Sequence, residues 1–243
     1  MSGDEMLEGG LSHKDCLEIA RYLAKTGMVD FFDVIGGAMY DYRGISISMA
    51  TMPLPAAPFL SLASAVKAET GMTVFHGQRI TDMATAARAI AEGHCDLVAM
   101  TRGHIADPHI VRKLMEGRAD DIRECVGAGW CIDRLFVGGE ALCLQNAATS
   151  REATMPHVIP KAAQRKKVVV VGAGPGGLEA ARVSAERGHA VVLFEADERT
   201  GGQINIAAKG PTRESLAGIV RWLDRQVSKL KVDLRLRTRA TAE

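Results

Sequence analysis

The chain has 243 residues, of which 47% are hydrophobic and 24% charged, and its 30 basic and 29 acidic side chains leave a net charge of +1. This composition predicts a folded protein with one large or two modest domains, and the balanced charge argues against nucleic acid or an anionic membrane as a partner. No stretch approaches the roughly 18 apolar residues that a membrane span requires, and the acidic start lacks the apolar core of a signal peptide, so we expect a cytoplasmic protein.

The first half of the chain alternates between helical and strand patterns. Helices are expected over 14–25, 59–69 and 81–93 and after Asp107 and Pro108, and strands over 29–35, 72–76 and 96–100. Strands that alternate with helices predict right-handed crossovers and a parallel sheet. Only three strands are expected before residue 125, whereas a closed β/α barrel has eight, so the pattern indicates either the tail of a barrel or a small open sheet.

The rest of the chain divides into three parts. Residues 124–146 lose the periodicity and are rich in glycine and cysteine, and residues 147–166 have the composition of a linker. A second α/β pattern fills 167–243, with strands expected over 167–171, 190–195 and 232–237 and helices over 176–187 and 214–230. We therefore expect a β/α unit over 1–123, a cysteine loop, a linker and an incomplete Rossmann-like dinucleotide-binding domain.

A glycine-rich motif opens the second domain. The first strand runs into Gly172-Ala173-Gly174-Pro175-Gly176-Gly177 and then into a helical pattern. In such a motif Gly172 makes a tight turn, Gly174 admits a pyrophosphate next to the backbone, and Gly177 lets the helix pack closely. Glu195 follows at the end of the next strand, where a carboxylate can accept hydrogen bonds from ribose hydroxyls and disfavours a 2′-phosphate. The motif predicts dinucleotide binding.

Two arginines follow strands of the first half. Gln78 and Arg79 come after the strand that ends at His76, and Thr101 and Arg102 come after the strand that ends at Met100. Loops at the carboxyl ends of neighbouring β/α strands commonly hold phosphate groups, and an arginine can bind a phosphate through two hydrogen bonds. The alternative for both arginines is a solvated side chain or a pair with a carboxylate.

Four stretches then resemble a known family. Residues 79–82, 98–102, 105–108 and 116–123 are similar to the last two barrel units of the trimethylamine dehydrogenase and 2,4-dienoyl-CoA reductase family, and the likeness extends over about 29–239. That family combines an FMN-binding barrel of the Old Yellow Enzyme type, a four-iron cluster loop and a nucleotide domain. The resemblance implies a carboxyl-terminal portion of a TIM (β/α)8 barrel, completed by amino-terminal strands of the same full-length chain. It also implies that the FMN phosphate is held by Gln78, Arg79, Thr101 and Arg102.

The second domain carries a further likeness. The turn that contains Gly202 and Gln203 resembles the loop by which flavoproteins with two dinucleotide domains continue along FAD, although an ordinary glycine turn is the alternative. FAD, or ADP or NAD(H), is therefore the expected ligand of this domain.

The cysteine loop departs from the family pattern. The family has four cysteines in this segment; three match, Cys125, Cys131 and Cys143, and Ala128 stands at the second position. Thiolates are the ligands that iron–sulfur clusters require, so the resemblance implies an iron–sulfur centre bound by these three residues. Ala128 leaves three interpretations open: a cluster with one non-cysteine or exchangeable ligand, a three-iron cluster, or a loop without metal.

The loop after the first strand carries the candidate catalytic residues. Tyr40, Asp41 and Tyr42 could contact a cationic amine, pair with it or transfer a proton. The reductase branch of the family has a histidine proton donor near Tyr40, and this sequence has none there. Leu135 replaces an aromatic that lines the trimethylamine pocket, so a bulkier N-methyl compound, of the N-methylproline or dimethylglycine type, is the expected substrate.

The resemblance thus implies oxidative demethylation of an N-methyl amine, with electrons passing from a small-molecule substrate to FMN and on through an iron–sulfur centre. Two alternatives remain. One is NAD(P)H-dependent reduction of a conjugated enoyl double bond of the 2,4-dienoyl-CoA type. The other is a non-catalytic nucleotide-binding fragment that needs a partner, because an open parallel sheet leaves unpaired edges. A homo-oligomer is left open.

Overall fold

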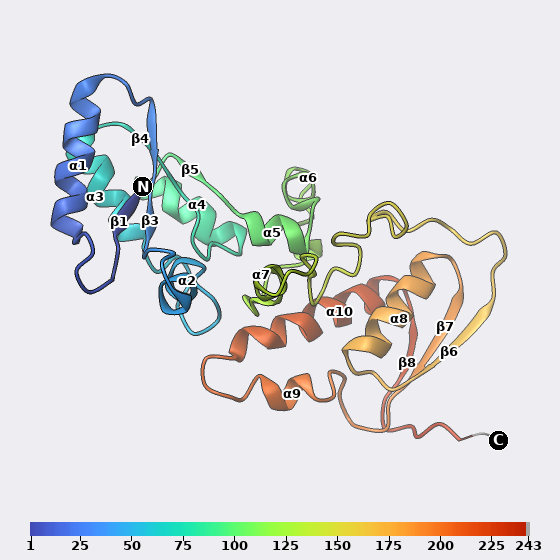
Figure 1. Ribbon diagram of the computed structural model, residues 1–243. Coiled ribbons are helices and arrows are strands. Elements are labelled where there is room, and N and C mark those ends of the chain that lie inside the picture. The colour runs from blue at the N-terminus through green and yellow to red at the C-terminus, as the bar shows by residue number, and fades with distance from the viewer. Residues whose placement is uncertain (242–243) are drawn as a thin grey trace. The chain divides into compact units, whose positions relative to one another are not determined.

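A computed structural model describes residues 1–241 of the chain (Figure 1). The chain forms two compact units: unit 1 contains Met1–Ile105 and Gly127–Gly129, and unit 2 contains Ala106–Val126 and the described residues from Trp130 onward. The sequence had suggested a division near residue 123, but residues 106–123 group with the second unit. Within the described residues no helix has the length and apolar character that crossing a bilayer requires.

Unit 1 contains two small parallel sheets. The larger has the strand order β2-β4-β5, formed by β2 (Phe31–Asp33), β4 (Thr73–His76) and β5 (Leu97–Val98), with Phe32 opposite Val74 and Phe75 opposite Leu97. The smaller pairs β1 (Ser2–Asp4) with β3 (Ile35–Gly36). The parallel arrangement predicted from the sequence is confirmed.

The strand expected over 29–35 is split into two. The Val34 amide donates to the carbonyl of Phe75, whereas the Ile35 amide turns to the carbonyl of Met1, both at 3.0 Å. The chain therefore changes sheets at this point. β1, the partner on the second sheet, was not expected, because glycine and aspartate are depleted in strands.

Five helices accompany these sheets: α1 (His13–Thr26), α2 (Tyr42–Ser48), α3 (Leu60–Thr70), α4 (Met83–Ala91) and α5 (Thr101–Ala106). α1 begins at a capping box between Ser12 and Asp15, and it ends at Gly27, whose φ of 68° places it in the left-handed region. α2 and α5 were not expected from the sequence. α5 begins in the segment that was expected to be the loop after the strand over 96–100.

The two faces of the larger sheet differ. Phe32, Val34 and Val74 are buried in a core with side chains of α1, α3 and α4, and this core also contains Cys95. On the opposite face the rings of Phe31 and Phe75 stack at 4.6 Å, and Phe31 and Leu97 are about half exposed. An apolar face without cover is what strands of an incomplete β/α barrel would present, because neighbouring strands fill that interior in a closed one.

Unit 2 is built on a three-stranded parallel sheet. Its strands are β6 (Lys167–Val171), β7 (Ala190–Phe194) and β8 (Asp233–Arg235), in the order β6-β7-β8. α8 (Pro175–Glu186) connects the first two strands and packs against α10 (Ala217–Lys229), while α9 (Ile204–Ala207) is short. The helix expected over 214–230 begins as a 3₁₀ turn, η2 (Glu214–Leu216), before the α-helical part.

The remaining elements of unit 2 are α6 (Ile110–Met115), η1 (Ala119–Asp121) and α7 (Trp130–Phe136). The helix that was expected after Asp107 and Pro108 begins at Ile110. The N-cap is His109, and Asp107 accepts a hydrogen bond from the backbone amide of His109 at 3.1 Å.

Candidate functional site

The glycine loop between β6 and α8 has open space beside Gly174 but no room for a side chain at Gly177. Gly172 has a φ of 91° and donates from its amide to the carbonyl of Phe194 at 2.8 Å. A Cβ at Gly177 would lie 1.8 Å from the carbonyl oxygen of Gly172, whereas a Cβ at Gly174 would meet no atom within 4 Å. Only Gly177 is therefore required for packing. The space at Gly174, beside the amino-terminal residue Pro175 of α8, fits a phosphate next to the backbone.

Glu195 lies beside the same loop. Its carboxylate accepts hydrogen bonds from the amides of Ala173 at 2.6 Å and Asp197 at 2.9 Å. Hydrogen bonds from the backbone of Asp197 and Ala173 hold the pKa of Glu195 below its ordinary value, so the side chain is ionised at neutral pH. A fixed negative charge suits ribose hydroxyls and disfavours a 2′-phosphate.

The second glycine turn packs against the first. Gly201 donates from its amide to the carbonyl of Ala173 at 2.8 Å, and a Cβ at Gly202 would lie 3.4 Å from the Cα of Gly174. Gln203 is the N-cap position of α9. The two turns thus form neighbouring walls of one cradle within unit 2.

In unit 1 the side chain of Gln78 forms hydrogen bonds with the backbone of neighbouring segments. Its side chain is buried, the amide oxygen accepts from the Gly36 amide at 2.5 Å, and the amide nitrogen donates to the carbonyls of Gly36 at 2.8 Å and Ser48 at 2.6 Å. These bonds tie β3 and the end of α2 to the loop after β4. Since the amide is used in this way, the phosphate-binding role expected from the family rests mainly on the arginines.

Both arginines meet the chain segment 50–57. The carbonyl of Arg79 accepts from the amide of Ala57 at 3.1 Å, and Nη2 of Arg102 donates to the carbonyl of Ala50 at 3.2 Å. Nη1 of Arg102 is buried, with no hydrogen-bond partner among the described residues. A buried cationic donor without an acceptor fits an anionic ligand such as a phosphate. Thr101 is exposed and begins α5.

The expected catalytic loop is partly helical. Asp41 is the N-cap of α2 and its Oδ1 accepts from the amide of Gly44 at 2.7 Å, so its carboxylate already has a structural use. Tyr40 and Tyr42 are 84% and 81% exposed. Both rings are therefore accessible on the surface of unit 1.

The cysteine loop supplies three of the four thiols that a four-cysteine cluster requires. All five cysteines lie in the described part of the chain and none forms a disulfide. Cys131 lies in α7, and the Sγ of Cys143 accepts from the amide of Gln145 at 3.4 Å. Within residues 1–241 no group of three or more histidine, cysteine, aspartate or glutamate side chains is arranged to hold a metal ion. With a methyl group at Ala128 in place of a thiolate, the donor set does not fit a four-cysteine cluster, and we assign no electron-transfer step to one.

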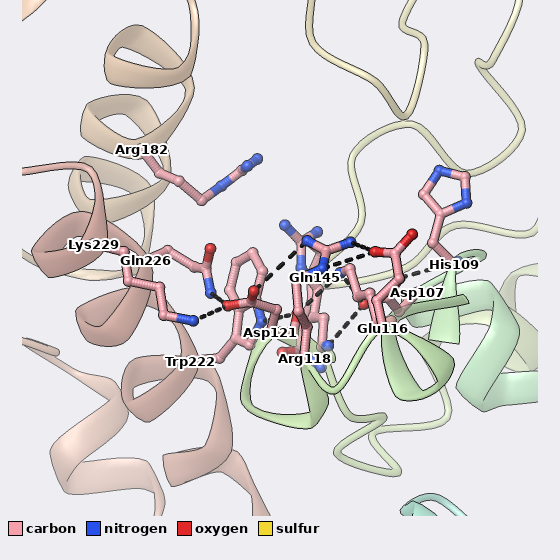
Figure 2. A network of polar contacts seen from close by, with 12 residues as sticks. Asp107, His109, Glu116, Arg118, Asp121, Gln145, Arg182, Trp222, Gln226 and Lys229 are labelled. Atoms are coloured by element: carbon pink, nitrogen blue, oxygen red, sulfur yellow. Dashed lines mark hydrogen bonds and ion pairs between the residues drawn. The ribbon is translucent and has the colours of Figure 1, made fainter. Parts of the chain in front are cut away.

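A network that the sequence did not reveal lies elsewhere in unit 2 (Figure 2). Asp121 accepts from the side chains of Gln226, at 3.3 Å, and Lys229, and its backbone carbonyl accepts from Nε1 of Trp222 at 3.0 Å. The guanidinium of Arg123 lies 4.0 Å from the centre of the Trp222 ring. Together these contacts fix η1 and its neighbours to α10.

Asp107 is a second centre of the same network. Its Oδ2 accepts from Nζ of Lys113 at 2.5 Å and from the amide of Arg123 at 2.9 Å. Arg123 continues to the carbonyl of Gln145, which anchors the far end of the cysteine loop. Asp107, Lys113 and Arg123 are among the residues that line a pocket of about 640 Å³. The acidic stretch at 120–121 was visible in the sequence, but nothing local indicated its partners.

The strand, glycine loop and helix of unit 2, with Glu195 at the end of the next strand, define a Rossmann-like nucleotide-binding domain. Residues 170–219 match the family described as an NAD(P)-binding Rossmann-like domain. The chain belongs to the trimethylamine dehydrogenase and 2,4-dienoyl-CoA reductase family of flavin oxidoreductases. It spans about a third of the length of the relatives that it matches.

Three comparisons support this assignment. The chain is 52% identical over 240 residues to the N,N-dimethylglycine/sarcosine dehydrogenase of Chromohalobacter salexigens, which covers 98% of the chain and 35% of that protein. It is 46% identical over 242 residues to a protein of Rhizobium meliloti named a probable N-methylproline demethylase, covering 100% of the chain and 36% of that protein. The structure of a 2-naphthoyl-CoA reductase with 2-naphthoyl-CoA matches with a TM-score of 0.91 and 32% identity, over 100% of this chain and 36% of that one.

Proposed function

We propose that the chain is part of a flavin-dependent oxidoreductase that oxidatively demethylates an N-methylated amine. The observation that carries the flavin part is the buried Nη1 of Arg102, which has no hydrogen-bond partner in the part of the chain that the structure describes. The substrate class is supported by the identity of 52% and 46% to proteins named for dimethylglycine, sarcosine and N-methylproline. Because the chain spans about a third of those relatives, the activity belongs to the longer protein.

Each site residue of unit 1 has a separate role in this proposal. Arg79 and Arg102 would hold the phosphate of FMN, with the Thr101 hydroxyl as a further donor, while Gln78 fixes the backbone beneath them. Bound FMN would accept a hydride from the N-methyl group, and water would release formaldehyde from the resulting iminium. The exposed rings of Tyr40 and Tyr42 would contact the cationic amine.

Asp41 is a weaker candidate than Tyr40 and Tyr42 for contact with the cationic amine. Its carboxylate caps α2 through Oδ1, which accepts from Gly44, so the capping bond restrains the position in which it could pair with an amine. We therefore propose an orienting role for Asp41 and no proton transfer. Removing its charge would then alter both the helix start and the attraction of a cationic substrate.

The cradle of unit 2 would bind the ADP portion of FAD, or ADP or NAD(H). Gly172 and Gly174 would admit the pyrophosphate at the start of α8, and Glu195 would accept hydrogen bonds from the ribose. Gly202 and Gln203 would continue the wall along the ligand. The open space at Gly174 and the ionised carboxylate support this assignment.

Enoyl reduction is the second candidate. The observation that favours it is the TM-score of 0.91 to a 2-naphthoyl-CoA reductase. A non-catalytic fragment is the third, and the uncovered apolar face at Phe31 and Leu97 agrees with a need for further strands. We place demethylation first because the most similar proteins described above act on, or are named for, N-methyl amines.

The test uses the full-length protein under anaerobic conditions. N,N-dimethylglycine, sarcosine and N-methylproline are each added, and bleaching of the flavin absorbance is compared with the formaldehyde released. The proposal expects both signals in equal amounts with at least one amine. A protein that is inert to all three but oxidises NADH with a conjugated enoyl-CoA would establish the reductase instead, and a purified protein without flavin would leave only the non-catalytic role.

A further inference from the structure

The central glycines of the cysteine loop pack within unit 1, although the residues on both sides of them belong to unit 2. The carbonyl of Gly127 accepts from the amide of Met52 at 2.9 Å, and a Cβ at Gly129 would lie 3.2 Å from Cγ2 of Thr51. These contacts place the glycines on the segment 50–57. The same segment bonds to the carbonyl of Arg79 and to the guanidinium of Arg102.

Gly127 lies directly against the side chain of Arg79. A Cβ added at Gly127 would lie 2.3 Å from Nη1 and 3.4 Å from Cζ of Arg79. The φ of Gly127 is 71°, and Arg79 is itself in the left-handed region with a φ of 50°. A non-glycine residue in this conformation carries strain that the surrounding contacts must offset. The backbone of both residues is therefore fixed by packing, and the guanidinium occupies the space that a side chain at Gly127 would need.

We propose that Gly127 is a positioning residue for the flavin phosphate, because its bare backbone fixes the guanidinium of Arg79. The inference rests on the proposed function, in which Arg79 binds that phosphate. The role belongs to the backbone of the loop and not to its thiols, so it holds whatever Cys125, Cys131 and Cys143 bind. The loop therefore has a structural role in FMN binding that does not depend on a fourth cysteine at position 128.

The substitution Gly127→Ala tests this role without preventing folding. The new methyl group meets the far end of a long, flexible side chain, which can swing away, so the predicted defect is a displaced guanidinium. Gly138→Ala is the matched control, because Gly138 has a φ of 73° and its Cβ would meet nothing within 4 Å. The two variants share the backbone strain and differ only in the contact with Arg79.

The measurement is the Kd for FMN, titrated into the deflavinated full-length protein, together with the thermal unfolding temperature. Both glycine variants should lose a similar amount of thermal stability. Only Gly127→Ala should weaken FMN binding, by roughly tenfold, the effect of losing one good hydrogen bond to a charged group. In an Arg79→Ala background Gly127→Ala should cause no further loss, because it acts through the guanidinium.

Failure of the inference and failure of the proposed site give different results. If Arg79→Ala and Arg102→Ala leave the Kd for FMN unchanged, the phosphate site is wrong and the inference falls with it. If those variants weaken FMN binding but Gly127→Ala behaves like Gly138→Ala, only the positioning role is overturned. An equal loss from Gly127→Ala with and without Arg79 also overturns it.

Discussion

The indole nitrogen of Trp222 donates a hydrogen bond to the backbone carbonyl of Asp121 at 3.0 Å, between residues 101 positions apart in the sequence. Trp222 is buried on α10, and the guanidinium of Arg123 lies over its ring, 4.0 Å from the ring centre. This bond explains why residues 106–126 belong to unit 2. A segment that the sequence assigned to the β/α half is held by the nucleotide-binding half.

Replacing Trp222 by phenylalanine should destabilise unit 2. The change retains an aromatic ring but removes the N–H, which leaves the carbonyl of Asp121 with Nζ of Lys113 as its donor, at 2.9 Å, and a small void beside Arg123. We expect a loss of about 1 kcal/mol in the free energy of unfolding, measured by urea denaturation. Trp130→Phe is the control, because Trp130 is 40% exposed, and should cost less than about 0.5 kcal/mol. Equal losses would contradict the role of the hydrogen bond.

Asp121 should make the stability of unit 2 sensitive to acid. Burial acts to raise its pKa, but hydrogen bonds from Lys229 and Gln226 and the charges of Lys229 and Arg118 outweigh burial, so the pKa lies below its ordinary value. A carboxyl whose pKa is lower in the folded state stabilises the fold at pH values above its unfolded pKa, near 4. That stabilisation is lost as the pH falls through the folded pKa.

The test is denaturant unfolding at a series of pH values between about 6 and 3. Asp121→Asn should be less stable than the parent at pH 6, and the difference should shrink as the pH falls. Asp120→Asn serves as the control, since the side chain of Asp120 is 82% exposed and pairs with Arg225 at 3.3 Å. A difference that stays constant down to pH 3 would show that the charge of Asp121 does not matter.

Local patterns predicted the parts of the fold that short-range chemistry decides. A helix was expected over 14–25 because apolar residues recur at helical spacing and Gly27 can adopt the left-handed conformation that ends it, and the structure places α1 over 13–26. The glycine loop before α8 was predicted for a similar reason, since Gly172 adopts a φ of 91° and Gly177 has no room for a Cβ.

Contacts between distant residues could not be predicted in this way. β1 is formed by Ser2-Gly3-Asp4, which have little strand preference, and it exists because β3 lies alongside, more than 30 residues later. The partners of Asp121 on α10 were equally invisible, because a charged side chain in a sequence does not indicate which opposite charge it will meet. The capping role of Asp41 was missed since the helix after it has only seven residues.

Two glycine substitutions in unit 2 should separate stability from ligand binding, because Gly177→Ala should affect the fold and Gly174→Ala the binding of the dinucleotide. Gly177→Ala would place a methyl group 1.8 Å from a backbone carbonyl that cannot move independently, so we expect a loss of stability of about 1–3 kcal/mol. Gly174→Ala meets no atom within 4 Å at a φ of −67°, so the fold should tolerate it. If the space is the pyrophosphate site, Gly174→Ala should weaken binding of FAD or ADP by roughly tenfold or more in calorimetric titrations of the full-length protein. Unchanged binding would place the ligand elsewhere.

The iron content of the protein tests whether the cysteine loop binds a cluster without a cysteine at position 128. Three thiols and a methyl group at Ala128 do not make a four-cysteine site, so we expect the full-length protein, purified anaerobically, to contain clearly fewer than four iron atoms and four labile sulfides per chain. Ala128→Cys restores the fourth thiolate and should raise the iron content after reconstitution if the loop can still close around a cluster. Val126→Cys is a suitable control, because it adds a thiol two positions away at a residue that packs in the core. A full complement of iron in the unchanged protein would mean that another group supplies the fourth ligand, and the donor set would have to be reassigned.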